Sequence, residues 1–88
     1  MKVYVVLIPE TVTDDCIIRV FADEKNAIVS FLSIMKDQLK DDSIADETIA
    51  AVNSGSIDNL RELKIKYAYR WYQAHKYFYP AVWEMDVK

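Results

Sequence analysis

The apolar run KVYVVLI at residues 2–8 constrains the fold of this chain more than any other segment. Its β-branched and aromatic residues are those that strands prefer. Because alternate side chains of a strand point to opposite faces, both faces here are apolar. One face would carry Val3, Val5 and Leu7, and the other Tyr4, Val6 and Ile8. We therefore expect a central strand that is covered on both sides.

Two further segments are expected to pair with this strand. Pro9 ends the first strand, because proline cannot donate to a hydrogen-bond ladder. The run CIIRVF at residues 16–21 predicts a strand that returns antiparallel after a loop. In residues 81–87, AVWEMDV, an apolar set of alternate positions faces a set that includes Glu84 and Asp86. This pattern predicts an edge strand beside the first, with one solvated face.

The middle of the chain predicts helices. Asp23 is a candidate N-cap, and apolar residues recur at steps of three and four from there to about Lys40. Ser43 is expected to cap a short second helix. Gly55 is expected to end that helix in a left-handed conformation, with Ser56 as the cap of the segment that begins at residue 57.

Residues 57–79 fit two patterns. Strict alternation over residues 63–71 is typical of a strand, whereas a period near 3.6 predicts a helix. The helix is favoured because residues 73–76 hold no turn-forming residue, and alanine, glutamine and lysine are helix formers. The core positions of that helix would be Leu60, Leu63, Tyr67, Trp71, Ala74 and Phe78.

These elements predict one α+β domain over residues 1–88, with a three-stranded antiparallel sheet packed against two or three helices. Eighty-eight residues are too few for a second core. The single cysteine allows no internal disulfide, and no 20-residue stretch is continuously apolar. We therefore expect a cytoplasmic protein without a membrane span.

Several features at the two ends of the chain are familiar. They are the opening MKVYVV, a strand ending at Phe21, the helix start DEKNA and the terminal WEMD. Over residues 1–32 and 81–88 the chain resembles small uncharacterised proteins of phages and prophages with a ββαβ core. The resemblance implies an accessory protein in the host cytoplasm that binds and inhibits a host protein, such as a defence protein. It implies no catalytic residue.

The sequence lacks the residue sets of common catalytic and metal sites. Cys16 and His75 are the only residues of their kinds, and two such ligands cannot build a structural zinc site. Cys16 is expected to be a small buried apolar residue. Gly55 is the only glycine, which excludes a glycine-rich phosphate loop. We expect no catalytic residue, no metal, no cofactor and no enzymatic activity.

The unusual feature is the number of aromatic residues outside the predicted core of the 57–79 helix. Ile65, Tyr69 and Tyr72 would share the face opposite Leu63, whereas in a strand they would not. Tyrosine and arginine are typical of protein-binding hot spots, although exposed tyrosines can also be ordinary surface residues. The sequence thus predicts a surface for a host protein or a second copy, with a homodimer expected unless helices cover the sheet fully. Its basic neighbours would be Arg61, Arg70 and Lys76.

Nucleic acid is the alternative ligand. The cations of residues 61–77 could contact phosphates while the tyrosines stack on bases, but a net charge of −3 argues against it. The acidic run at residues 37–47 could in turn mimic a phosphate backbone. We favour a simpler interpretation, in which the acidic run and the basic helix attract each other within the domain.

Overall fold

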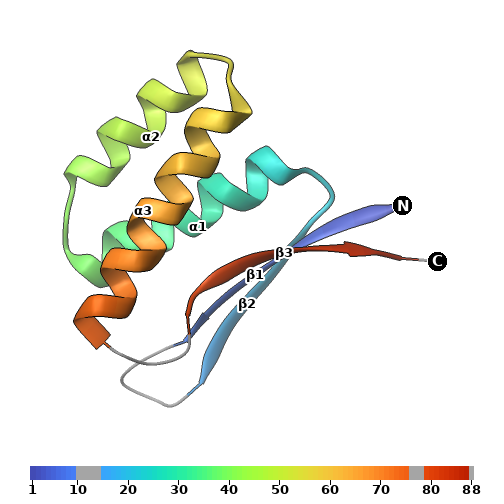
Figure 1. Cartoon of the computed structure of the whole chain (residues 1–88), viewed down its shortest axis with the longest axis horizontal. Helices are drawn as coiled ribbons and strands as arrows, with labels where there is room; N and C mark the ends of the chain where they lie inside the picture. Colours follow the sequence, from blue (N-terminus) through green and yellow to red (C-terminus); the bar gives the residue numbers. More distant parts are fainter. Residues whose placement is uncertain (10–14, 76–78, 88) are drawn as a thin grey trace.

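The computed structural model describes residues 1–9, 15–75 and 79–87 and has the predicted α+β fold (Figure 1). Three strands form one antiparallel sheet, and three helices follow one another between the second and third strands. In chain order the elements are β1 (Lys2–Pro9), β2 (Cys16–Phe21), α1 (Glu24–Leu39), α2 (Ser43–Asn53), α3 (Ile57–His75) and β3 (Ala81–Asp86).

The sheet has the strand order β2-β1-β3, so β1 is central and β3 is an edge strand, as the sequence predicts. Both neighbours of β1 are antiparallel to it. Val5 is paired with Val20 of β2 on one side and with Trp83 of β3 on the other. Because paired residues point to the same face, these three side chains form one row across the sheet.

The helices cover only one face of this sheet (Figure 1). Helix α1 packs on the strands, and α2 and α3 pack on α1 and on each other. Val6 and Ile8 on the helix side are fully buried, whereas Val3, Val5 and Leu7 are only half-buried. The prediction that β1 is covered on both sides is therefore wrong. The apolar stripes of the three helices meet in one common core, so no helix is left for the second face.

The ambiguous segment is a helix from Ile57 to His75. Leu60, Tyr67 and Trp71 are buried as expected, but Ala74 is exposed and Phe78 lies outside the described residues. The reason for the error at Ala74 is that α1 ends too early. The Trp71 indole N–H donates to Gln38 in the last turn of α1, at 2.6 Å, so Ala74 lies beyond the end of its neighbour.

The helix ends agree with the sequence at Asp23 and at Gly55. The Asp23 carboxylate accepts a hydrogen bond from the Lys25 N–H at 2.8 Å, and Gly55 has φ +73°. The prediction that Ser43 caps α2 is wrong. Ser43 is the first residue of that helix, and both its N–H and its hydroxyl donate to the Asp41 carboxylate. The N-cap position belongs to Asp42, and the Asp41 carboxylate, one residue earlier, accepts the two hydrogen bonds from Ser43.

Two aspartates test the contribution of the Asp23 cap. Both Asp23 and Asp42 stand at N-cap positions, but only Asp23 makes a side-chain cap hydrogen bond. We expect Asp23→Ala to lower the free energy of unfolding by about 1 kcal/mol, because an orphan N–H loses its acceptor. Asp42→Ala is the matched control, and urea denaturation of both variants gives the comparison. Equal losses in the two variants would contradict this assignment.

Candidate functional site

The predicted aromatic face of α3 is exposed. Ile65, Tyr69 and Tyr72 leave 64%, 53% and 40% of their surface open to solvent, and their spacing of four and three residues places them on one side of the helix. The opposite side of α3 carries the buried Tyr67 and Trp71. The structure thus brings together the three apolar residues that the sequence singled out.

A further tyrosine joins this face from a different segment. The Tyr79 ring lies with its centroid 5.1 Å from that of Tyr72, and the two planes are tilted by 31°. Tyr79 is half exposed, while the next residue, Pro80, is fully buried and fixes the chain there. We call Ile65, Tyr69, Tyr72 and Tyr79 the tyrosine surface. Sequence reasoning missed Tyr79, although its separation of seven residues from Tyr72, about two helical turns, was a signal that could have found it.

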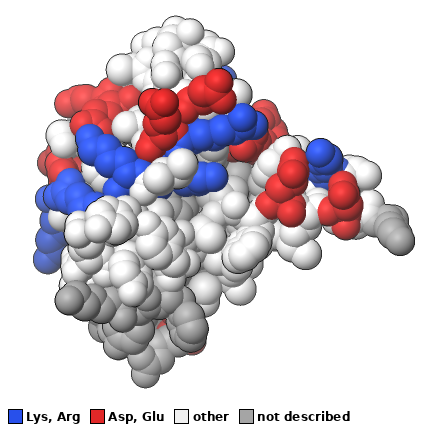
Figure 2. All heavy atoms as spheres, viewed as in Figure 1, with Lys and Arg blue, Asp and Glu red and all other residues white. Residues whose placement is uncertain are grey.

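The basic neighbours of the tyrosine surface are held in ion pairs. Arg61 contacts both carboxylate oxygens of Glu24, at 2.6 and 3.0 Å, and Arg70 contacts Asp41 at 2.5 Å. Figure 2 shows this mixture of positive and negative side chains over the helices. The predicted partner Lys76 lies outside the described residues. Arg61 and Arg70, the described basic residues of the predicted site, therefore already have acidic partners.

A further ion pair, between Lys66 and Glu47, joins α3 to α2 beside the buried Tyr67. The Tyr67 hydroxyl donates to the Glu47 carboxylate, and Lys66 lies 3.4 Å from the same carboxylate and 5.0 Å from the Tyr67 ring. Burial, followed by the hydrogen bond to Glu47, raises the pKa of Tyr67 to about 12. The expected attraction between the acidic run and the basic helix is thus confirmed at Glu47 and at Asp41.

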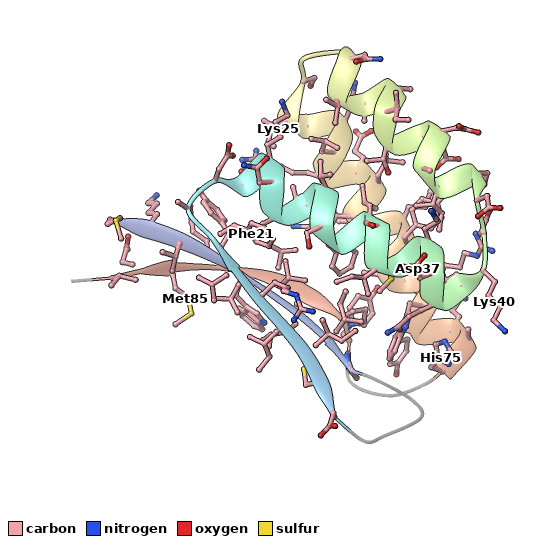
Figure 3. The ribbon with its side chains drawn as sticks, turned by 180° about the vertical axis from the view of Figure 1, so that it is seen from behind. Phe21, Lys25, Asp37, Lys40, His75 and Met85 are labelled. Carbon is pink, nitrogen blue, oxygen red and sulfur yellow. The ribbon has the colours of Figure 1, made fainter. Side chains whose placement is uncertain are left out.

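A second exposed apolar surface covers the side of the sheet that faces away from the helices. Figure 3 shows the contrast between the faces: Phe21 points towards α1, and Met85 points away from the helices. We call this side the outer sheet face. By pairing and alternation it consists of Val3, Val5, Leu7, Pro9, Cys16, Ile18, Val20, Ala81, Trp83 and Met85.

The sequence could not show which side of each strand would be exposed. Residues 81–87 were expected to have one solvated, polar face, but Trp83 and Met85 are more than half exposed as well. Cys16 is exposed on this face, so its predicted burial is wrong. Alternation alone divides each strand into two sets of residues, but it does not say which set the helices cover.

The described residues contain little that resembles a catalytic site. No three His, Cys, Asp or Glu side chains among residues 1–9, 15–75 and 79–87 cluster as metal ligands. The Cys16 thiol contacts the carbonyl of Ile17, and the His75 ring packs on Trp71 at 4.7 Å. A cleft of about 500 Å³ opens beside the first turn of α1, where Glu24 is already bound by Arg61.

Comparison of the chain with protein-family models, with curated proteins and with solved structures gives no match. Within the described part of the chain, no helix combines the length and the apolar character needed to cross a membrane. The tyrosine surface and the outer sheet face are the two candidate functional sites.

The Asp41 contacts have a measurable electrostatic consequence. The Ser43 hydroxyl, and then Arg70, lower the pKa of Asp41 from 3.8 to about 2. Because this pKa is lower in the folded state, the ionised carboxylate stabilises the fold above about pH 4, and the effect is lost as the pH falls towards 2. We expect Ser43→Ala and Arg70→Gln each to raise the pKa, measured from the carboxyl carbon shift by NMR.

Arg19→Gln on β2 is the control for this titration, since Arg19 donates to the Ile18 carbonyl and not to Asp41. It should leave the pKa of Asp41 unchanged. An Asp41 carboxyl that titrates near 3.8 in the unmodified protein would show that these contacts do not form in solution.

Proposed function

We propose that this protein is a non-enzymatic binding module that acts stoichiometrically on another protein through the tyrosine surface. The observation that carries the proposal is the exposed group of Ile65, Tyr69, Tyr72 and Tyr79 on one side of the molecule. Tyrosine provides a large contact area at a low cost in side-chain entropy, which is why it is common in binding hot spots. A helix that is anchored by Trp71 presents these side chains without prior rearrangement.

The pairing of nearby charges supports a protein partner. With Arg61 and Arg70 bound to carboxylates, the exposed group between them is aromatic and apolar. Such a surface suits a partner with an apolar pocket and a polar rim, the usual anatomy of a protein interface. The resemblance to phage proteins makes the partner a host protein in the host cytoplasm, such as a defence protein, and this origin remains a prediction.

The same ion pairs disfavour the nucleic-acid alternative. Binding to phosphates draws its free energy from cations that release counterions, and Arg61, Lys66 and Arg70 would first have to leave their acidic partners. A labelled single-stranded oligonucleotide at low salt tests this alternative. Tight binding that weakens steeply with added salt would favour it over a protein partner.

We also propose that the protein functions as a homodimer. The sequence predicts one unless the helices cover the sheet fully, and they pack on one face only. An uncovered apolar face of this kind is a common mark of an interaction site.

The double substitution Tyr69→Ala and Tyr72→Ala tests the tyrosine surface. We expect loss of at least about 100-fold in affinity for the partner, because two hot-spot tyrosines of about 2 kcal/mol or more are removed together. The partner is first identified by affinity capture from a host lysate and mass spectrometry, and its affinity is then measured by calorimetry. Circular dichroism checks that the double variant folds, which is expected since both side chains are exposed.

The matched control is Ile49→Ala on α2, an apolar residue that is 58% exposed and lies outside the tyrosine surface. It should bind the partner as the unmodified protein does. Unchanged affinity of the double tyrosine variant would disprove the proposed surface.

A further inference from the structure

The two faces of the sheet differ in whether they carry charged side chains. On the helix side, the end of the sheet near the two termini extends past the helices, and there the chain places Lys2, Glu84 and Asp86. Tyr4 on this side donates its hydroxyl to Glu84, and Lys2 forms an ion pair with it at 3.4 Å. The chain thus has polar residues where this face meets solvent.

The outer sheet face has no such residues. Each of its ten positions is apolar or a cysteine, over the full length of all three strands. Ile18, Val20, Trp83 and Met85 are each more than half exposed. A face of this composition is typical of a surface that is covered in the working form of a protein.

The area of the outer sheet face is sufficient for a dimer. A large side chain contributes about 150–250 Å² when fully exposed, so this face presents on the order of 600 Å² of apolar surface. Two such faces packed together would remove about 1,200 Å² from water, the lower limit of standard stable interfaces.

The distribution of side-chain size favours a second copy of this chain. The bulky Trp83 and Met85 lie on one edge strand, and the smaller Ile18 and Val20 lie on the other edge. A two-fold axis parallel to β1 and midway between two outer sheet faces places β2 of one copy over β3 of the other. By register, Trp83 then meets Val20 and Ile18 meets the small Ala81 at both edges, the match of large and small side chains that a well-packed interface between two sheets requires.

The pairing with Val5 defines which residues meet. Val20 and Trp83 lie at the same level of the sheet, because both are paired with Val5. The axis described above therefore sets Val20 against the partner's Trp83, and Trp83 against the partner's Val20. An axis perpendicular to the strands would stack Trp83 on the partner's Trp83 and leave the smaller residues facing each other.

A membrane fits this face less well. Peripheral proteins that bind anionic lipid surround an apolar surface with lysine and arginine. Within residues 1–9 and 79–87, the charged side chains at the terminal end of the sheet are Lys2, Glu84 and Asp86, which sum to one negative charge. The surface of a second copy, apolar and without charge, matches the outer sheet face directly.

We infer that two copies of this chain pack through their outer sheet faces, with β2 of each over β3 of the other. The dimer has four layers, with helices outside and two sheets inside. Since the tyrosine surface lies on α3, the dimer presents two of them and binds two partner molecules. The inference supplies the interface of the proposed homodimer and rests on that part of the proposed function.

Charged substitutions on the outer sheet face test this inference by sedimentation equilibrium. We expect the unmodified protein to have the mass of two chains and Val20→Lys the mass of one, because a lysine facing the partner's Trp83 would be buried without a counter-ion. Asn26→Lys adds the same charge at an exposed position of α1 and should remain a dimer. The double tyrosine variant should also remain a dimer, so failure of the two proposals can be distinguished.

A mass of one chain for the unmodified protein at its highest attainable concentration would overturn the inference, as would a folded Val20→Lys variant that remains a dimer. A one-chain species that sediments with phosphatidylcholine vesicles would also overturn it, in favour of a membrane. Tryptophan fluorescence tests the inference without any substitution. Trp71 is fully buried in one chain, whereas Trp83 is 57% exposed and becomes buried in the proposed dimer. The dimer is therefore expected to emit at short, blue wavelengths, with no component from a solvent-exposed indole. Emission of an exposed indole at high concentration would contradict it.

Discussion

The structure depends on β1, whose two faces are both apolar although the helices cover only one of them. On one side, Val6 and Ile8 pack beneath α1 in a core that continues to Phe31 and Trp71, and all of these residues are fully buried. This contact joins the sheet to the helical layer, and burial of large apolar side chains is the main source of free energy for a domain of this size. On the other side, equally apolar residues have no cover within the chain. The same strand that organises the core therefore also produces the exposed outer sheet face.

Ion pairs organise the helical layer in a different way. Arg61 binds Glu24 of α1. Lys66 binds Glu47 of α2, and Arg70 binds Asp41, which precedes α2. Each pair is at least partly exposed, and single exposed pairs stabilise proteins little. Burial of Tyr67 and Trp71 fixes which side of α3 turns inwards, and the ion pairs connect that helix to α1 and to residues in and before α2. The remaining side, with Ile65, Tyr69 and Tyr72, is left neutral and exposed. Most of the tyrosine surface is therefore the side of α3 that does not pack against the rest of the chain.

Much of the fold could be predicted from local patterns in the sequence. Alternation and proline placed the strands, and the steps of three and four placed α1, because those signals depend only on backbone geometry. The Asp23 cap and the left-handed Gly55 were predictable for the same reason. Ala74 and Cys16 were assigned wrongly because their burial depends on where a neighbouring element ends or which face it covers. The outer sheet face could not be found, since it arises from pairing between distant segments, whereas Tyr79 lies only seven residues after Tyr72 and was missed because it falls beyond the end of α3.

Burial of the outer sheet face against a second copy is tested most directly by an isotope-filtered NMR experiment. In a mixture of labelled and unlabelled chains, only contacts between two copies are recorded. Val20 and Trp83 of one chain lie on the two outer strands, about 10 Å apart across β1, which is too far for a strong cross-peak within the chain. We expect intermolecular cross-peaks between the Val20 methyl groups and the Trp83 indole. A spectrum in which these protons show no intermolecular contact would contradict the proposed dimer.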